Sequence, residues 1–185
     1  TSETSEHVEQ TVIEAKDKTH KIELLQDLLA QDGYEKVLVF GETKFGVQRL
    51  SDHLSKEGVR SEAIHGNKSQ AQRQRALKAF RDERVRVLVA TDVAARELDI
   101  PNVSHVINFD QPKTYEDYIH RIGRTGRAGR SGIAISLVNH AEGVHVKRIE
   151  RFTKQVIPVD IIEGYEPKKK ASAAAPSRRP GWRPG

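Results

Sequence analysis

The stretch VRVLVATDVAARELDIP, residues 85–101, decides the fold that we expect. Its first six residues, 85–90, form a short apolar run that is typical of a buried central strand. The residues that follow Ala90 are polar and charged, so the strand is expected to end there. In open α/β sheets, ligands gather at the carboxyl ends of strands. This stretch therefore predicts both a strand and a place to look for function.

Similar apolar runs recur along the chain and alternate with helical periodicity. Further strands are expected at 8–15, 36–40, 61–66, 105–110 and 133–138. Apolar residues recur at helical spacing over 18–31, 43–57, 69–81 and about 142–153, and residues 115–122 fit a helix that ends near Gly123. This alternation predicts an α/β domain with an open, mostly parallel sheet and helices on both faces.

The expected strand ends share polar or charged neighbours. They are Phe40, His65, Ala90, Asp110 and Val138. Because parallel strands end at the same edge of a sheet, we expect the functional residues to gather at this carboxyl edge.

The charge of the chain is unevenly distributed. The 185 residues carry a formal net charge of +5, yet residues 1–165 hold 25 basic and 25 acidic side chains. The excess lies in EPKKKASAAAPSRRPGWRPG, residues 166–185, where Trp182 and the arginines suit contacts with a polyanion. We expect a lead at 1–7, one domain at 8–162 and a disordered basic tail at 163–185.

Composition excludes several classes of protein. The absence of cysteine excludes disulfides, a thiolate nucleophile and cysteine-ligated metals. No apolar run approaches the roughly 20 residues that span a bilayer, and the polar, acidic N-terminus is unlike a signal peptide. We expect a soluble, cytoplasmic protein with no membrane contact and no metal site of its own. The absence of methionine, including an initiator, favours a fragment or a processed product.

Two phosphate-binding motifs are missing from the sequence. No G-x-G-x-x-G follows the first strand, and no G-x-x-x-x-G-K-[ST] loop occurs. The fold is typical of nucleotide-related proteins, but the half that would cradle the phosphates is not in this chain.

The stretch HRIGRTGRAGRSG, residues 120–132, has four arginines and four glycines, each at a spacing of three. No acidic residue occurs between Asp117 and Glu142. The repeat is too short for collagen and lacks its proline, and interior glycines disfavour a long helix. A flexible basic loop and an anion-binding cradle of guanidinium groups both remain open on these residues alone.

The motifs VLVFGETK, HGNKSQAQR, VLVATDVAARELDIP, VINFDQP and YIHRIGRTGRAGRSG, taken in order, resemble the second RecA-like domain of DEAD-box ATP-dependent RNA helicases. The resemblance covers about residues 8–162 and implies a RecA-like sheet. The family carries its Walker loop and its D-E-A-D carboxylates on a first domain. This chain therefore resembles half of an enzyme, expected to be inactive alone.

The resemblance implies an ATP site shared with the first domain, which would hold most of the Mg²⁺ contacts. Arg124 and Arg127 would reach the γ-phosphate as catalytic arginine fingers, and Asp99 would accept hydrogen bonds from the ribose hydroxyls. His120 would help to couple the two domains, although a histidine satisfied at a helix end is an equal alternative. Arg121 is placed at the same interdomain region, with a structural contact or an acidic partner as the favoured role.

The resemblance also implies contacts with the RNA backbone, and ATP-driven closure of the two domains on RNA would separate the strands of a duplex. The resemblance implies that the residues contacting the RNA are Thr43, Gly66, Gln70, Arg73 and Thr91. Two readings compete with this one: a non-catalytic RNA-binding module, and a superfamily 2 helicase domain that acts on DNA. Charge cannot separate RNA from DNA, because both carry phosphates.

Two details of the motif at 90–99 are open. Asp92 and Arg96 either touch a ligand or form an ion pair with each other. Glu97 occupies a position where the family usually has glycine. It is expected either to face the RNA backbone and repel it, or to point away and pair with a nearby lysine or arginine.

Overall fold

A computed structural model describes residues 7–153 and 159–160 of the chain. The basic tail predicted at 163–185 and all but the last residue of the predicted N-terminal lead lie outside the described residues. The expectations for those segments stay predictions.

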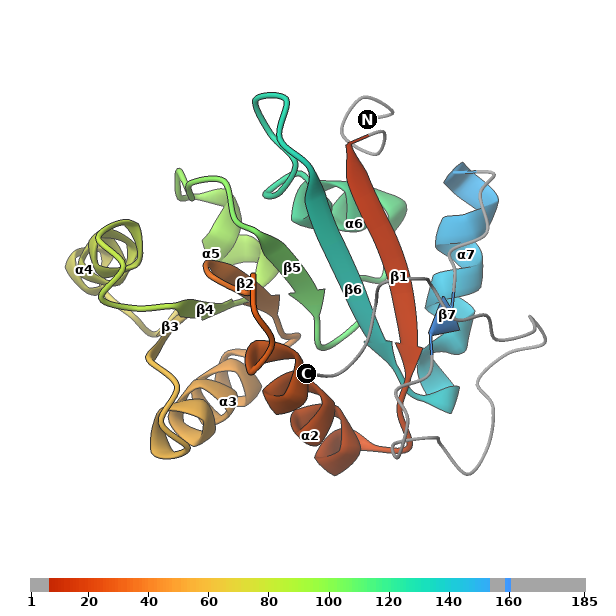
Figure 1. Ribbon diagram of the computed structural model, residues 1–185, viewed down its shortest axis with the longest axis horizontal. Coiled ribbons are helices and arrows are strands. Elements are labelled where there is room, and N and C mark those ends of the chain that lie inside the picture. Colours follow the sequence, from red (N-terminus) through yellow and green to blue (C-terminus); the bar gives the residue numbers. More distant parts are fainter. Residues whose placement is uncertain (1–6, 154–158, 161–185) are drawn as a thin grey trace.

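The described residues form an open sheet in which every strand pairing is parallel (Figure 1). The strand order is β3-β4-β2-β5-β6-β1-β7. The strands are β1 (Val8–Glu14), β2 (Val37–Phe40), β3 (Ser61–Ile64), β4 (Val87–Ala90), β5 (His105–Asn108), β6 (Gly132–Val138) and the short β7 (Val159–Asp160). The expected mostly parallel sheet is confirmed.

Helices connect the strands and cover both faces, as expected. They are α2 (Lys18–Leu29), α3 (Lys44–Lys56), α4 (Gln70–Arg81), α5 (Asp92–Arg96), α6 (Tyr115–Ile122) and α7 (Gly143–Thr153), with a 3₁₀ turn, η1, at His140–Glu142. Figure 1 shows α5 and α6 behind the strands and α2 and α3 together on the other side. Among the described residues, no helix is both long and apolar enough to cross a membrane.

Alternating strand residues divide the interior into two cores. Leu38, Leu88 and Val106 point into one core with apolar residues of α4, α5 and α6. Val37, Val89 and Ile107 point into the other with apolar residues of α2 and α3. Because neighbouring residues of a strand face opposite sides, a strand buried on both faces needs the continuous apolar runs seen in the sequence.

Hydroxyl side chains fix where several helices begin. Thr43, Ser69, Thr91 and Thr114 each accept a hydrogen bond from the backbone N–H three residues on. At Ser69 the side chain of Gln72 accepts in return from the Ser69 N–H, which completes a capping box. These caps place three helix starts directly after the strand ends that carry the expected RNA contacts.

The boundaries of the predicted elements differ from the structure by only a few residues. The helix at 115–122 has the predicted bounds. However, α5 was not expected, because five residues are too few to show helical periodicity. Strands β3 and β5 end at Ile64 and Asn108, so His65 and Asp110 belong to the loops that follow rather than to the strands.

Candidate functional site

Three of the predicted RNA contacts lie together at the carboxyl edge of the sheet. Phe40 and Ile64 both pair with Ala90, so the segments that follow these three residues leave the sheet side by side. Thr43, Gly66 and Thr91 belong to those segments, and the Thr91 N–H donates to the Ile64 carbonyl at 3.2 Å. The sheet register therefore brings together residues that are 23 to 48 positions apart in the sequence. We call this surface the strand-end edge.

Positive charge gathers at the strand-end edge. Burial lowers the pKa of His65, and the charges of Lys68, Lys44 and Arg73 lower it further. The imidazole is thus kept neutral at physiological pH. It shares a 2.8 Å hydrogen bond with the Gln48 side chain.

The backbone at this edge is accessible to a partner. Gly66 is exposed, and a Cβ built there meets no atom within 4 Å. Lys44 Nζ donates to Asn67 Oδ1 at 3.1 Å, which ties the start of α3 to the loop after β3. The predicted Gln70 is exposed on the first turn of α4. The edge thus combines accessible backbone at Gly66, the exposed side chain of Gln70 and the positive charge of Lys44.

Sequence reasoning missed Phe45 at this edge. It lies in the first turn of α3 with 64% of its surface exposed, and Lys44 Nζ lies 5.5 Å from the centre of its ring. An apolar residue at this position breaks the helical pattern, because α3 buries Val47, Leu50, Ser51 and Leu54. That mismatch between residue type and helix face is the signal that the sequence offered.

Glu97 pairs with Arg73, the last predicted RNA contact. Its Oε1 accepts from Arg73 Nη1 at 2.6 Å. The alternative in which Glu97 pairs with a neighbouring arginine is therefore confirmed, and whether Glu97 also faces RNA stays a prediction. Glu97 has φ −83° and ψ −1°, an ordinary right-handed conformation. No glycine-specific backbone angle is needed there.

Arg124 and Arg127 lie on the loop that connects α6 to β6, residues 123–131, which we call the arginine loop. Arg124 donates to the carbonyls of Leu98, at 3.4 Å, and Ala95, at 3.1 Å. Arg127 donates through Nη2 to the Ile100 carbonyl, and its Nε is buried without a partner. Neither guanidinium forms an ion pair within the described residues. Both guanidinium groups therefore face backbone carbonyls.

Asp99 lies close enough to Arg124 to act on it electrostatically. Burial lowers the pKa of Arg124, the charge of Arg127 lowers it further, and the charge of Asp99 opposes the shift. Asp99 itself is exposed and makes no ion pair or hydrogen bond with another described residue. Two guanidinium groups and an accessible carboxylate thus occupy one surface.

Two glycines, Gly126 of the arginine loop and Gly132 at the start of β6, serve internal packing. A Cβ on Gly132 would lie 2.4 Å from the Gly126 nitrogen, and a Cβ on Gly126 would lie 2.8 Å from the His7 carbonyl oxygen. Gly126 also has φ +70°, which other residues rarely adopt. These two glycines are therefore explained by the close approach of the loop to the starts of β6 and β1, with no anion needed.

Arg121 points inward and joins α6 to two other segments. Its guanidinium donates to both carboxylate oxygens of Asp92 at 2.8 Å, to Asn108 Oδ1 at 3.1 Å and to the Asp110 carbonyl at 2.6 Å. The carbon of the guanidinium lies 4.9 Å from the Phe40 ring centre. With 2% of its surface exposed, Arg121 makes the structural contact with an acidic partner that the sequence favoured. Any interdomain role is then indirect.

The ion pair between Asp92 and Arg96, one of the two alternatives left open by the sequence, does not form. Asp92 pairs with Arg121, and Arg96 pairs with Asp117 of α6. Both partners belong to α6, so the two ion pairs join α5 to α6. His120 is half-exposed at the end of α6, with Nε2 4.0 Å from Glu116, and it lines a shallow cleft with Arg96 and Arg124.

The structure separates the predicted site into two parts. The predicted RNA contacts lie at the carboxyl edge, but the arginine loop precedes β6 and lies near the amino end of that strand (Figure 1). The carboxyl edge, which the sequence indicated as the place to look for function, therefore does not include the loop that carries Arg124 and Arg127. Helix α6 leaves β5 at the carboxyl edge and carries the chain back to the opposite edge, as a parallel connection must.

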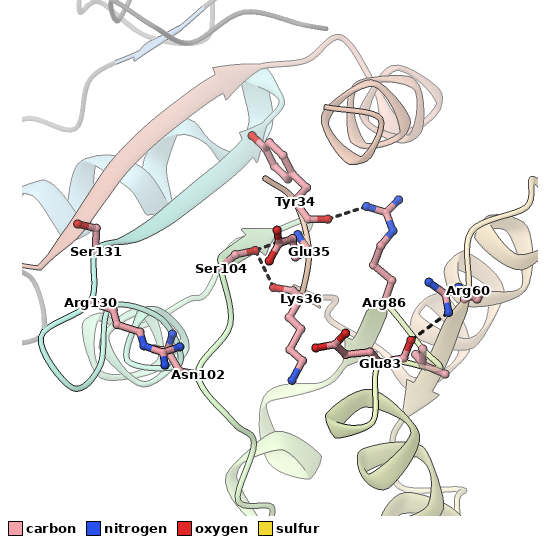
Figure 2. Close-up of a pocket in the computed structure, with 11 residues that line it drawn as sticks. Tyr34, Glu35, Lys36, Arg60, Glu83, Arg86, Asn102, Ser104, Arg130 and Ser131 are labelled. Atoms are coloured by element: carbon pink, nitrogen blue, oxygen red, sulfur yellow. Dashed lines mark hydrogen bonds between the residues drawn. The ribbon is translucent and has the colours of Figure 1, made fainter. Parts of the chain in front are cut away.

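A cavity lies at the amino edge, apart from the strand-end edge (Figure 2). It has a volume of about 660 Å³ and is lined by loops that precede β2, β3, β4, β5 and β6. Its cations hold these loops together: Arg60 donates to the Glu83 carbonyl at 3.0 Å, and Arg86 donates to the Tyr34 carbonyl at 2.7 Å. Next to it, burial lowers the pKa of His105 to about 4, and the ring stacks on Tyr34 at 3.6 Å. We interpret this cavity as structural.

Comparisons with known proteins agree with this geometry. Residues 20–129 match the family described as helicase conserved C-terminal domain. The chain is 47% identical over 152 residues to the DEAD-box ATP-dependent RNA helicase CshA of Bacillus cereus. This chain is a C-terminal helicase domain of the DEAD-box family. The aligned part is 82% of the chain and 29% of that relative, so the helicase domain spans less than a third of the curated relatives that it matches.

Solved structures place the helicase domain in the RecA-like fold. The Escherichia coli DEAD-box protein SrmB, solved bound to regulator of ribonuclease activity A, superposes with a TM-score of 0.85 at 40% identity. That match covers 90% of this chain and 98% of the SrmB chain. Saccharomyces cerevisiae Dbp5, solved bound to RNA and ADP BeF3, gives a TM-score of 0.76 at 32% identity over 84% of this chain and 41% of that Dbp5 chain. The expected family and fold are confirmed.

Proposed function

We propose that this domain supplies the second half of a composite ATP and RNA site in an ATP-dependent RNA helicase. Arg124 and Arg127 act on the γ-phosphate, Asp99 accepts from the ribose hydroxyls, and the strand-end edge holds the RNA backbone. Closure of a first RecA-like domain onto this one brings the arginines to the nucleotide and clamps a single strand. Hydrolysis then loosens the clamp, so that strand separation follows from closing and opening.

One observation carries the proposal for ATP. The guanidinium groups of Arg124 and Arg127 are held only by backbone carbonyls within the described residues, beside an exposed Asp99. A guanidinium has five N–H donors, so each arginine keeps donors for phosphate oxygens. An arginine stabilises the charge that develops on the transferred phosphoryl group. The side chains present therefore fit the nucleotide that the family uses.

The Mg²⁺ that accompanies ATP would neutralise phosphate charge, but this domain is not proposed to hold it. Among the described residues, no group of three or more acidic or histidine side chains could bind a metal ion. The contribution of this domain is to position its own side chains. The ion pairs Asp92–Arg121 and Arg96–Asp117 join α5 to α6, and this fixes Arg124 relative to Asp99.

The purified chain should show no ATPase activity above background, with or without RNA, because it lacks a phosphate loop. Phosphate release is measured with the chain alone and after addition of a first RecA-like domain from a close relative. Activity that appears only in the mixture, and is lost with Arg124→Ala, supports the composite site. Robust turnover by the chain alone would contradict it.

Phe45 is proposed to stack on an RNA base beside the backbone contacts of Thr43 and Gly66. Stacking on an aromatic side chain is worth about 1–3 kcal/mol per base. Phe45→Ala should therefore weaken binding of single-stranded RNA by about fivefold or more, as measured by fluorescence anisotropy. The free energy of unfolding should change by less than about 0.5 kcal/mol, because the side chain is exposed.

Two controls define the Phe45 result. Phe45→Trp should retain RNA affinity, and Val144→Ala, at a valine of α7 that is 56% exposed, should leave it unchanged. An equal loss for both alanine variants would indicate a nonspecific effect. Repeating the titration with single-stranded DNA of the same sequence separates an RNA helicase from a domain that acts on either polymer.

A further inference from the structure

The ion pair between Glu97 and Arg73 joins two elements at the strand-end edge. Arg73 lies in the first turns of α4, and Glu97 follows the last residue of α5. Besides the 2.6 Å contact with Glu97, Arg73 donates through Nε to the Lys68 carbonyl at 3.3 Å. Glu97 is the only acidic partner of Arg73 among the described residues. The charge of a proposed RNA contact is therefore already neutralised by the protein.

Arg73 and Glu97 differ in how well water can hydrate each side chain when the ion pair opens. The Arg73 side chain is 14% exposed, whereas the Glu97 side chain is 57% exposed. If the pair opens, the Glu97 carboxylate regains most of its hydration, but the Arg73 guanidinium stays largely buried and needs another anion. A phosphate oxygen is such an anion, because a guanidinium binds carboxylate and phosphate with the same geometry.

We infer that Glu97 competes with RNA phosphate for Arg73 and sets the threshold at which this domain accepts RNA. In the free domain, Glu97 holds the guanidinium in place and neutralises it. On binding, the RNA backbone takes over Arg73, and Glu97 turns into solvent. This inference rests on the proposed RNA-binding function, and it makes Glu97 a residue that tunes affinity and contributes no contact of its own.

The backbone at Glu97 adds nothing to this role. Its right-handed conformation is one that any residue adopts, so Glu97→Gln changes the charge and leaves the fold of α5 intact. The same change at Glu57 is a matched control, because Glu57 is an exposed residue that caps α3 at the end away from the strand-end edge.

The test is a double-mutant cycle on the whole chain, with the dissociation constant for single-stranded oligouridine measured by anisotropy. Arg73→Gln alone should weaken binding. Glu97→Gln alone should tighten it by about three- to fivefold, the range expected when one half-exposed ion pair no longer competes. In the Arg73→Gln background, Glu97→Gln should have no effect. Glu57→Gln should have no effect in either background.

The dependence of binding on salt gives a second readout. Releasing Arg73 from Glu97 adds up to one phosphate-neutralising charge, so Glu97→Gln should steepen the log–log salt slope by up to about 0.7 for a single strand. Thermal unfolding of each variant checks that the domain remains folded.

The outcomes separate this inference from the function on which it rests. Equal tightening by Glu97→Gln in both backgrounds would show general charge repulsion and overturn the competition. No tightening, while Arg73→Gln still weakens binding, would overturn the role of Glu97 and leave the RNA contact standing. If Arg73→Gln leaves binding unchanged, the proposed RNA contact of Arg73 is wrong, and the competition is wrong with it.

Discussion

Arg127→Ala in a complete helicase that carries this domain should lower kcat by about 10³-fold or more, the range of an arginine finger in phosphoryl transfer. The dissociation constant for ATP should change far less, because the guanidinium acts mainly on charge that develops in the transition state. The arginine loop itself should persist, since the backbone N–H of residue 127 donates to Asn102 Oδ1 at 2.8 Å and does not depend on the side chain. Single-turnover kinetics and equilibrium binding of ATP measure the two quantities separately.

The same loop provides the controls for Arg127. Arg130 is exposed and lies three residues further along, so Arg130→Ala removes an equal charge without a proposed contact and should leave kcat within about twofold of the parent. Arg127→Lys should recover little, because an ammonium lacks the planar fork of a guanidinium. A loss of ATP affinity as large as the loss of kcat would show a ground-state phosphate contact and contradict the finger role.

Arg121→Met should lower the free energy of unfolding by about 3 kcal/mol, which for a domain of this size is roughly a 10 °C fall in Tm. Removing the guanidinium leaves Asp92 without its ion pair and leaves Asn108 Oδ1 and the Asp110 carbonyl without a donor. The Asp92 side chain is 25% exposed, so water can hydrate its carboxylate in part once the arginine is gone. The expected loss of stability is therefore at the low end of the range for a broken buried ion pair. Chemical denaturation of the isolated chain measures it.

A second pair of variants shows where the Arg121 effect arises. Arg75→Met changes an exposed arginine of α4 and should move stability by less than about 0.5 kcal/mol. Arg121→Lys should remain destabilised, because one ammonium cannot reach the Asp92, Asn108 and Asp110 acceptors together. A loss below about 1 kcal/mol for Arg121→Met would mean that Asp92 is fully hydrated and that the network contributes little.

The sequence determined the elements and most of the fold. Continuous apolar runs such as 85–90 predict strands buried on both faces, and helical spacing between them predicts the parallel connections. Both patterns are local, so they can be read from a single sequence. The unexpected α5 marks the limit of this approach, because its five residues are held by tertiary ion pairs and carry no periodicity of their own.

The sequence also indicated the candidate site residues, through the order of their motifs, but only the tertiary structure decided their partners. Arg121 lies 29 residues from Asp92, and Arg73 lies 24 residues from Glu97. Asp92 could have paired with Arg96 by sequence alone, and Glu97 had several basic neighbours. The choice depends on which side chains the packing of α4, α5 and α6 brings within 3 Å of one another. Charged side chains are long and flexible, so their pairing follows from the positions of whole helices, which no local pattern encodes.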